Sequence, residues 1–243
     1  MTKMSIQFSR KTLDFLVKAA KQKNPEWLDL HHEEYEAVLK KPFIALAEQI
    51  KKELQPQARD YHFPSKGLAR IKRPEFKVRG GQPQYKDWIS MIAAKPSPSR
   101  FESNPHLFFG LFPNENDKVI IAGGLWQPTP RQARLIREAI ANDSTDFHKL
   151  FKDKKFKASF PDGFYPKEKS LRVPRGFSEE AEDIEWIKLK KYVVYKSVPI
   201  KAFIAPHFQQ SVVKDLEQAL RLNRLLEKAL DVRERFNGAT DRQ

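Results

Sequence analysis

The chain has 243 residues, and 45 lysines and arginines against 31 aspartates and glutamates give it a formal net charge of +14. With 40% hydrophobic residues, including 18 Phe, 4 Trp and 6 Tyr, it has enough core-forming side chains to exclude a disordered protein. It has no cysteine, which excludes a disulfide framework, a thiolate zinc site, an iron–sulfur cluster and a cysteine nucleophile.

The first third of the chain is predicted to be helical. Ser9 is a suitable cap for a helix to about Lys21. Asn24-Pro25 marks the start of a second helix, lined by Trp27, Leu30 and Val38, and Pro42 marks the start of a third, whose apolar positions recur at helical spacing up to Leu54.

The middle of the chain is predicted to contain strands and loops. Pro74, Gly80-Gly81 and Pro83 divide segment 70–86 into strand and turn pieces, and the prolines of 93–105 predict a loop. Segments 107–112 and 118–122 are predicted strands joined by a turn at 113–117, and Gly123-Gly124 is expected to end the second strand.

The second half returns to helices. Thr129-Pro130 predicts a helix start, with a stripe of Ala133, Ile136 and Ile140, and Ser144 predicts a short helix after it. A strand at 171–173, a helix at 179–190, a strand at 192–198 and a long helix at 207–236 follow. The predicted fold is α+β. It is a single domain over 1–236, in which N-terminal helices and the long C-terminal helix pack on a mainly antiparallel sheet, followed by a disordered tail at 237–243.

The positive charge is concentrated in two segments. Segment 66–100 holds nine basic and two acidic residues, segment 149–175 holds nine basic and three acidic residues, and together they account for +13 of the +14. If the fold brings the two segments together, they form a surface that attracts anions. The alternative is that both are solvated, lysine-rich loops.

The residues predicted to bind an anion come mainly from these segments, because arginine offers a planar fork to phosphate and lysine a point charge. Phe76, Tyr85 and Trp88 are aromatic residues in the first segment that could stack on bases. Tyr85 is the best candidate, because Phe and Trp are core residues by default. The predicted ligand-binding set is Arg70, Arg73, Lys77, Arg79, Tyr85, Lys86, Arg137, Arg172 and Arg175.

Catalytic signatures are weak. The sequence contains no phosphate-binding glycine loop, no nucleophile elbow and no H-E-x-x-H motif. Asp60 precedes Glu75-Phe76-Lys77 in a D…E-x-K spacing of nuclease type, which makes Asp60 and Glu75 weak catalytic candidates. Adjacent histidines such as His31 and His32 point about 100° apart on a helix, so no metal site and no cofactor are predicted.

Four blocks of the sequence resemble an uncharacterised family, the domain of unknown function numbered 2461. They are Asn24-Pro25-Glu26-Trp27-Leu28 with Glu34-Tyr35, Arg70-Ile71-Lys72-Arg73 with Pro83-Gln84-Tyr85-Lys86, Ala122-Gly123-Gly124-Leu125-Trp126-Gln127-Pro128 with Ile136-Arg137 and Ile140, and Leu171-Arg172-Val173-Pro174-Arg175-Gly176-Phe177 with Trp186 and Leu189-Lys190. The blocks follow the family's order over about residues 9–230. The resemblance implies no activity, because the family has none established.

One departure from the family pattern concerns the first basic segment. The family has an aspartate after the residue that matches Arg73, whereas this chain has Pro74-Glu75. If that aspartate is catalytic in relatives, this chain has lost it or replaced it with Glu75. The resemblance therefore extends to Arg70, Arg73, Tyr85, Lys86, Gly124, Trp126, Pro128, Arg137, Pro174, Gly176 and Phe177.

The leading functional hypothesis is a basic protein that binds nucleic acid or another phosphate-bearing ligand. Two alternatives stay open: an enzyme acting on a small anionic or phosphorylated substrate, with or without a metal, and a non-catalytic interaction protein that uses the C-terminal helix. The N-terminus has no signal-peptide pattern and no apolar run approaches the roughly 18 residues of a membrane span, so a cytoplasmic protein that binds no membrane is expected.

Overall fold

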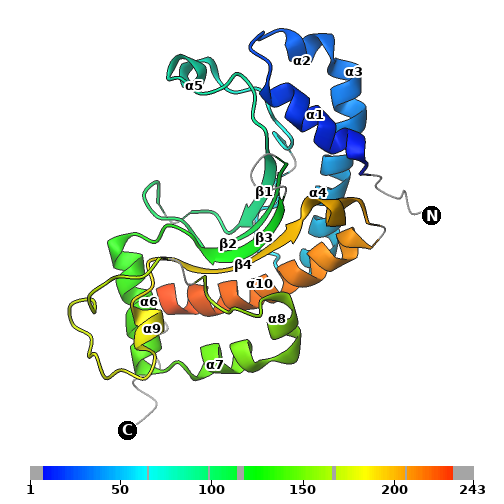
Figure 1. Cartoon of the computed structure of the whole chain (residues 1–243). Helices are drawn as coiled ribbons and strands as arrows, with labels where there is room; N and C mark the ends of the chain where they lie inside the picture. Colours follow the sequence, from blue (N-terminus) through cyan, green and yellow to red (C-terminus); the bar gives the residue numbers. More distant parts are fainter. Residues whose placement is uncertain are drawn as a thin grey trace. The chain divides into compact units, whose positions relative to one another are not determined.

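The structure, a computed structural model, describes residues 8–231 except 65, 98, 114–117, 166–167 and 206. The expected α+β class is confirmed. Strands β1 (Ile89–Ala94), β2 (His106–Phe112), β3 (Lys118–Leu125) and β4 (Tyr192–Pro199) form an antiparallel sheet in the order β1-β2-β3-β4 (Figure 1).

The chain divides into two compact units. Unit 1 comprises 1–93, 108–121 and 197–213, and unit 2 comprises 94–107, 122–196 and 214–243. Each sheet strand, and the long helix α10 (Phe208–Leu230), therefore contributes residues to both units. The two basic segments fall mainly in different units, with 66–93 in unit 1 and 149–175 in unit 2.

Unit 1 begins with helices whose starts the sequence predicts well. Helix α1 (Arg10–Ala20) has Ser9 as its N-cap, in a capping box with Thr12. It is followed by α2 (Trp27–Leu30), α3 (His32–Tyr35), the π-helix η1 (Glu36–Lys40) and α4 (Lys41–Leu54). The predicted second helix is thus broken at His31, which has non-helical angles (φ −113°, ψ 24°), and Leu30 is exposed rather than buried.

Pro42 explains the local widening of the helix at η1. An α-helix would place a hydrogen bond between the N–H of residue 42 and the Val38 carbonyl, but proline has no N–H to donate. The hydroxyl of the buried Thr12 donates to the Val38 carbonyl instead, at 2.8 Å. One buried threonine therefore satisfies the carbonyl that the proline leaves without a partner, and fixes α1 against the turn before α4.

The core of unit 1 is aromatic. The ring centroids of Phe43 in α4 and Phe109 in β2 lie 6.0 Å apart, and Phe208 at the start of α10 lies 6.3 Å from Phe109. Phe203, in the 3₁₀ helix η2 (Ile200–Ile204), lies 5.5 Å from Phe208. These contacts tie together segments that are far apart in the sequence.

Unit 2 contains α6 (Pro130–Asn142), α7 (Thr145–Lys152), α8 (Lys154–Ser159), α9 (Ile184–Ile187) and the later part of α10. Thr129 caps α6 through a capping box with Gln132, as its sequence predicts. The apolar residues of α10 are buried within the chain itself, among them Val212, Leu216, Leu222 and Leu226.

Gly123-Gly124 does not end β3 as predicted, because the strand continues to Leu125. Both glycines are required by close packing. A Cβ on Gly123 would lie 2.5 Å from the Cβ of Ala219 in α10, and a Cβ on Gly124 would lie 2.1 Å from the Tyr192 carbonyl oxygen. Gly124 also has a φ of +123°, which favours glycine.

Other predicted elements differ from the observed ones. Segment 70–86 contains a helix, α5 (Glu75–Arg79), and the sequence does not predict β1 or α8. Segment 171–173 is not a strand: Leu171 is 97% exposed and Pro174 follows it. The predicted helix 179–190 is limited to α9 (Ile184–Ile187), and the residues before it form turns.

Some predictions fall outside the described residues. The turn at 114–117 and the tail at 237–243 belong to this group, as do the last residues of the predicted helix 207–236. Up to Leu230 that helix is observed as α10.

Candidate anion-binding site

A short antiparallel pairing in unit 1 positions the first basic segment. The Arg73 N–H donates to the Gln84 carbonyl at 3.0 Å, and the Lys86 N–H donates to the Ile71 carbonyl at 2.9 Å. Lys72 and Tyr85 are the directly opposed pair. Residues diagonal across such a pair share a face, so Arg73 and Lys86 lie on the same side of the ribbon. Helix α5 lies at the outer end of the loop that joins the two pieces (Figure 1).

Four cations gather around this ribbon. Partial burial lowers the pKa of Lys86, and the positive charges of Arg73, Lys77 and Arg70 lower it further. These four side chains are therefore within electrostatic reach of one another. We refer to Arg70, Arg73, Lys77 and Lys86 as the cation cluster.

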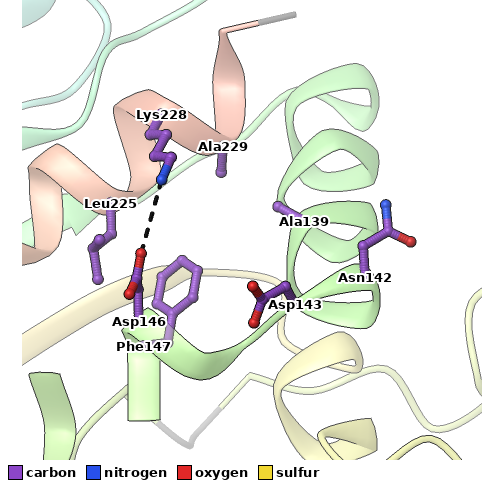
Figure 2. Close-up of a pocket in the computed structure, with 8 residues that line it drawn as sticks. All are labelled: Ala139, Asn142, Asp143, Asp146, Phe147, Leu225, Lys228 and Ala229. Carbon is purple, nitrogen blue, oxygen red and sulfur yellow. Dashed lines mark ion pairs between the residues drawn. The ribbon is translucent and has the colours of Figure 1, made fainter. Parts of the chain in front are cut away.

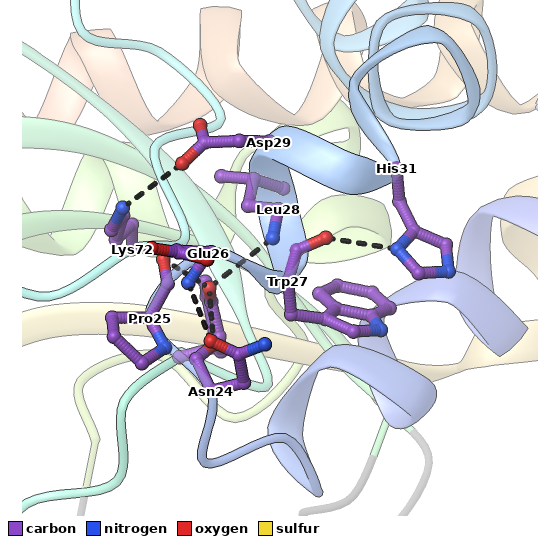
Figure 3. Close-up of polar contacts among 9 residues, drawn as sticks. Asn24, Pro25, Glu26, Trp27, Leu28, Asp29, His31 and Lys72 are labelled. Atoms are coloured by element: carbon purple, nitrogen blue, oxygen red, sulfur yellow. Dashed lines mark hydrogen bonds and ion pairs between the residues drawn. The ribbon is translucent and has the colours of Figure 1, made fainter.

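The cation cluster lacks acidic partners within the part of the chain that the structure describes. None of its four members is in an ion pair there, whereas the nearby Lys72 pairs with Asp29 at 3.5 Å (Figure 3). Arg79 pairs with Glu75. The Arg73 Nε is buried and has no hydrogen-bond partner among these residues. The Lys86 Nζ lies 4.7 Å from the centroid of the Trp88 ring. The predicted residue Arg79 thus lies beside the cation cluster but is neutralised by Glu75.

Backbone strain lies directly before Arg70. Ala69 has a φ of +57°, which is unusual for a residue with a Cβ. The buried hydroxyl of Tyr35 donates to the Ala69 carbonyl at 3.1 Å and holds this conformation. Such strain costs of order 1 kcal/mol or more and persists where the surroundings enforce it. The main chain that carries Arg70 is therefore held in place by the N-terminal helices.

Tyr85 is not available for stacking, so that prediction is wrong. Its side chain is 1% exposed, and its ring packs edge-on against Trp27 at 5.7 Å. Its single hydroxyl hydrogen is shared between the carbonyls of Asn24 and Pro25, whose oxygens lie 2.9 and 3.0 Å from the hydroxyl oxygen, and that oxygen accepts from the Leu28 N–H at 3.2 Å. The segment that receives these bonds is drawn in Figure 3. Tyr85 thus anchors the ribbon to the start of α2.

Replacing Tyr85 with Phe should destabilise the protein without affecting ligand binding. The variant leaves the Pro25 carbonyl and the Leu28 N–H without the hydroxyl, whereas the Asn24 carbonyl keeps the Trp27 N–H, and the loss costs about 1–3 kcal/mol. We expect a lower denaturation midpoint and an unchanged affinity for any anion at a temperature where the variant is folded. A loss of affinity with unchanged stability would contradict the structural role.

The lowered pKa of Lys86 leads to a prediction about pH. Because the folded pKa lies below the unfolded value, the charged form is disfavoured in the fold. Stability therefore increases as the pH rises from the lowered folded pKa toward the unfolded value of about 10.4. Lys86→Met should raise the thermal midpoint at neutral pH and abolish the increase in stability with pH. Methionine is chosen because its thioether keeps contact with the Trp88 ring. Lys201→Met at an exposed position is the control, and a lower midpoint for Lys86→Met would contradict the prediction.

The E-x-K part of the nuclease-like spacing is not formed as that chemistry requires. Glu75 and Lys77 lie on helix α5 rather than on a strand, and two positions along a helix point in nearly opposite directions. Glu75 is also paired with Arg79. No group of three or more His, Asp or Glu side chains suited to a metal ion is found among the described residues.

In unit 2, Arg137 makes hydrogen bonds that join distant parts of the fold, and its predicted contact with a ligand stays a prediction. Its Nε donates to the Ile187 carbonyl at 2.8 Å and its second terminal nitrogen donates to the Leu189 carbonyl at 3.0 Å. It thus holds the chain between α9 and β4. Burial raises the pKa of the neighbouring Tyr192 to about 12, although the charge of Arg137 opposes that rise.

In the second basic segment, 149–175, some arginines are exposed and some acidic residues are in ion pairs. Arg172 and Arg175 are exposed and have no ion pair in the described part of the chain. Two of the segment's three acidic residues are in ion pairs: Asp153 pairs with Arg221 at 2.9 Å, which lowers the pKa of Asp153 to about 2, and Glu168 pairs with Lys191 at 2.5 Å. Arg172 and Arg175 therefore remain candidates for a separate contact with an anion.

Two pockets of unit 2 do not contain the predicted residues. One, of about 300 Å³, is lined by α6, α7 and α10, and an Asp146–Lys228 ion pair of 3.8 Å spans it (Figure 2). The other, of about 370 Å³, has four aromatic residues in its lining, among them Phe151, Phe164 and Trp186, and a Lys169–Glu185 ion pair of 2.6 Å. In the cation cluster of unit 1, Arg70 and Lys77 are exposed, whereas Arg73 and Lys86 are half-buried.

These features define an α+β protein with a cation cluster on a backbone-paired ribbon. A family model described as "Conserved hypothetical protein (DUF2461)" matches residues 11–224, so the chain belongs to this family, as its sequence motifs predict. No curated protein and no solved structure matches it. None of the described helices is both long enough and apolar enough to cross a membrane.

Proposed function

We propose that this protein binds phosphate-bearing ligands, above all nucleic acid, through the cation cluster. The observation that supports this proposal is geometric: the backbone pairing places Arg73 and Lys86 on the same side of the ribbon, and none of the four cluster cations has an acidic partner among the described residues. The charges of the other three cations also lower the pKa of Lys86, after burial, which is the larger cause. Holding like charges together costs free energy in the unbound protein. A phosphate placed among them recovers that cost and accepts hydrogen bonds from the arginine forks.

The two kinds of cation have different roles in this proposal. Arg70 and Arg73 offer planar donors, and the buried Arg73 Nε is one donor without a partner within the described chain. Lys77, on helix α5, and Lys86, on the ribbon, supply point charges. Arg172 and Arg175, in the other unit, are proposed as a second set of phosphate contacts.

The test is fluorescence anisotropy with labelled single-stranded DNA, double-stranded DNA and RNA, titrated over salt. Binding through the four cluster cations should give a slope of log affinity against log salt of about −3, since each phosphate contributes roughly −0.7 in single strands and −0.9 in duplexes. An affinity that stays unchanged between about 50 and about 300 mM salt would refute the proposal.

An enzyme acting on a small phosphorylated substrate would use the same cations. Competition by inorganic phosphate at millimolar concentration distinguishes the enzyme from the nucleic-acid-binding protein. At a small-anion site, phosphate would displace the oligonucleotide. At an extended contact, phosphate would weaken oligonucleotide binding no more than another salt of the same ionic strength does.

A further inference from the structure

We infer that Phe76 stacks on unpaired bases, and that the cation cluster is therefore selective for single-stranded nucleic acid. This inference rests on the proposed function. Phe76 is 70% exposed, on the short helix α5. Positions two apart on a helix differ by about 200°, so Phe76 is directed away from the half-buried Val78 and toward solvent.

Phe76 lies within the basic region. It directly precedes Lys77, whose charge is felt at Lys86, and Arg73 comes three residues earlier. The other aromatic residues of this segment are engaged in the fold. Tyr85 is buried, and Trp88 stacks on Phe112 at 5.9 Å while Lys86 covers its ring. Phe76 is thus the aromatic residue of the segment that a ligand can reach.

An exposed aromatic ring beside several cations fits a ligand that combines negative charge with flat apolar surfaces. Single-stranded nucleic acid has both, since its phosphates follow the cations and its bases stack on aromatic side chains with about 1–3 kcal/mol each. In a duplex the base faces are already stacked on one another. Phe76 therefore contributes to single-strand binding and not to duplex binding.

The experiment compares Phe76→Ala with the wild-type protein on three labelled probes: a single strand of about 12 nucleotides, its duplex, and inorganic polyphosphate. The matched control is Phe101→Ala, because Phe101 is also exposed (73%) and lies beside a cation, Arg100, at 4.5 Å. Phe76→Trp retains an aromatic ring and should restore binding. Thermal melting of each variant establishes that it is folded.

We expect Phe76→Ala to weaken single-strand binding about 5- to 150-fold, the equivalent of 1–3 kcal/mol, and to leave duplex and polyphosphate binding unchanged. Phe101→Ala should bind all three probes as the wild type does. Equal effects of Phe76→Ala on all probes, or no effect on any, would overturn the inference but leave the proposed function standing, provided that the wild type binds polyphosphate in a salt-dependent way.

Two further outcomes are informative. If the wild type binds none of the three probes at low salt, the proposed function itself fails. If it binds vesicles of phosphatidylserine in a Phe76-dependent way but no oligonucleotide, the ring inserts into a lipid surface, and the single-strand inference is wrong.

Discussion

The double variant Arg70→Ala/Arg73→Ala should lose about 10- to 100-fold of its affinity for oligonucleotides at low salt. It removes two of the four positive charges of the cation cluster, so the slope of log affinity against log salt should fall by about 1.5 units. Arg70 is exposed and Arg73 is half-buried, and neither is in an ion pair within the described residues. The variant should therefore still fold. The measurement is the anisotropy titration described above.

The matched control is Arg10→Ala/Arg134→Ala, which removes the same charge from exposed arginines elsewhere in the chain. Each of these pairs with an acidic residue one turn away, Asp14 and Glu138 respectively. If the control loses as much affinity as the cluster variant, binding depends on net charge alone, and the cation cluster is not a site.

Gly124→Ala should be the most damaging single substitution for stability. The added Cβ would lie 2.1 Å from the Tyr192 carbonyl oxygen and 2.7 Å from the Val193 Cα, and both are backbone atoms of β4 that cannot rotate away. The φ of +123° adds strain of its own. Together these effects should cost about 3–5 kcal/mol, a large part of a typical stability of 5–15 kcal/mol.

Gly176→Ala separates the two causes of that loss. Gly176 has a φ of +91°, but a Cβ added there would meet no atom within 4 Å, so its substitution incurs the strain without the collision. Chemical denaturation of both variants measures the difference. Equal midpoints for Gly124→Ala and Gly176→Ala would show that the contact between β3 and β4 is not as close as described.

The parts of the fold that the sequence predicts are those with local signals. Ser9 and Thr129 mark helix starts as capping residues, and Pro130 does so through the geometry of its ring. Both predicted helix starts are confirmed. Strands β2 and β3 are predicted from short apolar runs, and β4 from alternating β-branched residues. Helix α5 is not predicted because prolines and glycines surround it, although Glu75 and Arg79, one turn apart, are a helical signal.

The roles of individual site residues depend on contacts that no local pattern records. Tyr85 bonds to residues about 60 positions earlier, and Arg137 bonds to carbonyls about 50 positions later. Their chemistry and their matches to a family motif make both residues binding candidates, and both prove to join distant segments. The charges of the cation cluster can be counted from the sequence, but which cations lack acidic partners depends on the fold.

The paired ribbon has a consequence for the speed and strength of association. Main-chain hydrogen bonds fix Arg73 opposite Gln84 and Lys86 opposite Ile71, and Tyr85 fastens the ribbon to the start of α2. Ordering a flexible backbone costs about 1–2 kcal/mol per residue, and here folding has already met that cost. For the proposed binding of a polyanion, the backbone that carries Arg73 and Lys86 is therefore ordered in advance, and only side-chain rotamers would need to be restricted when a complex forms.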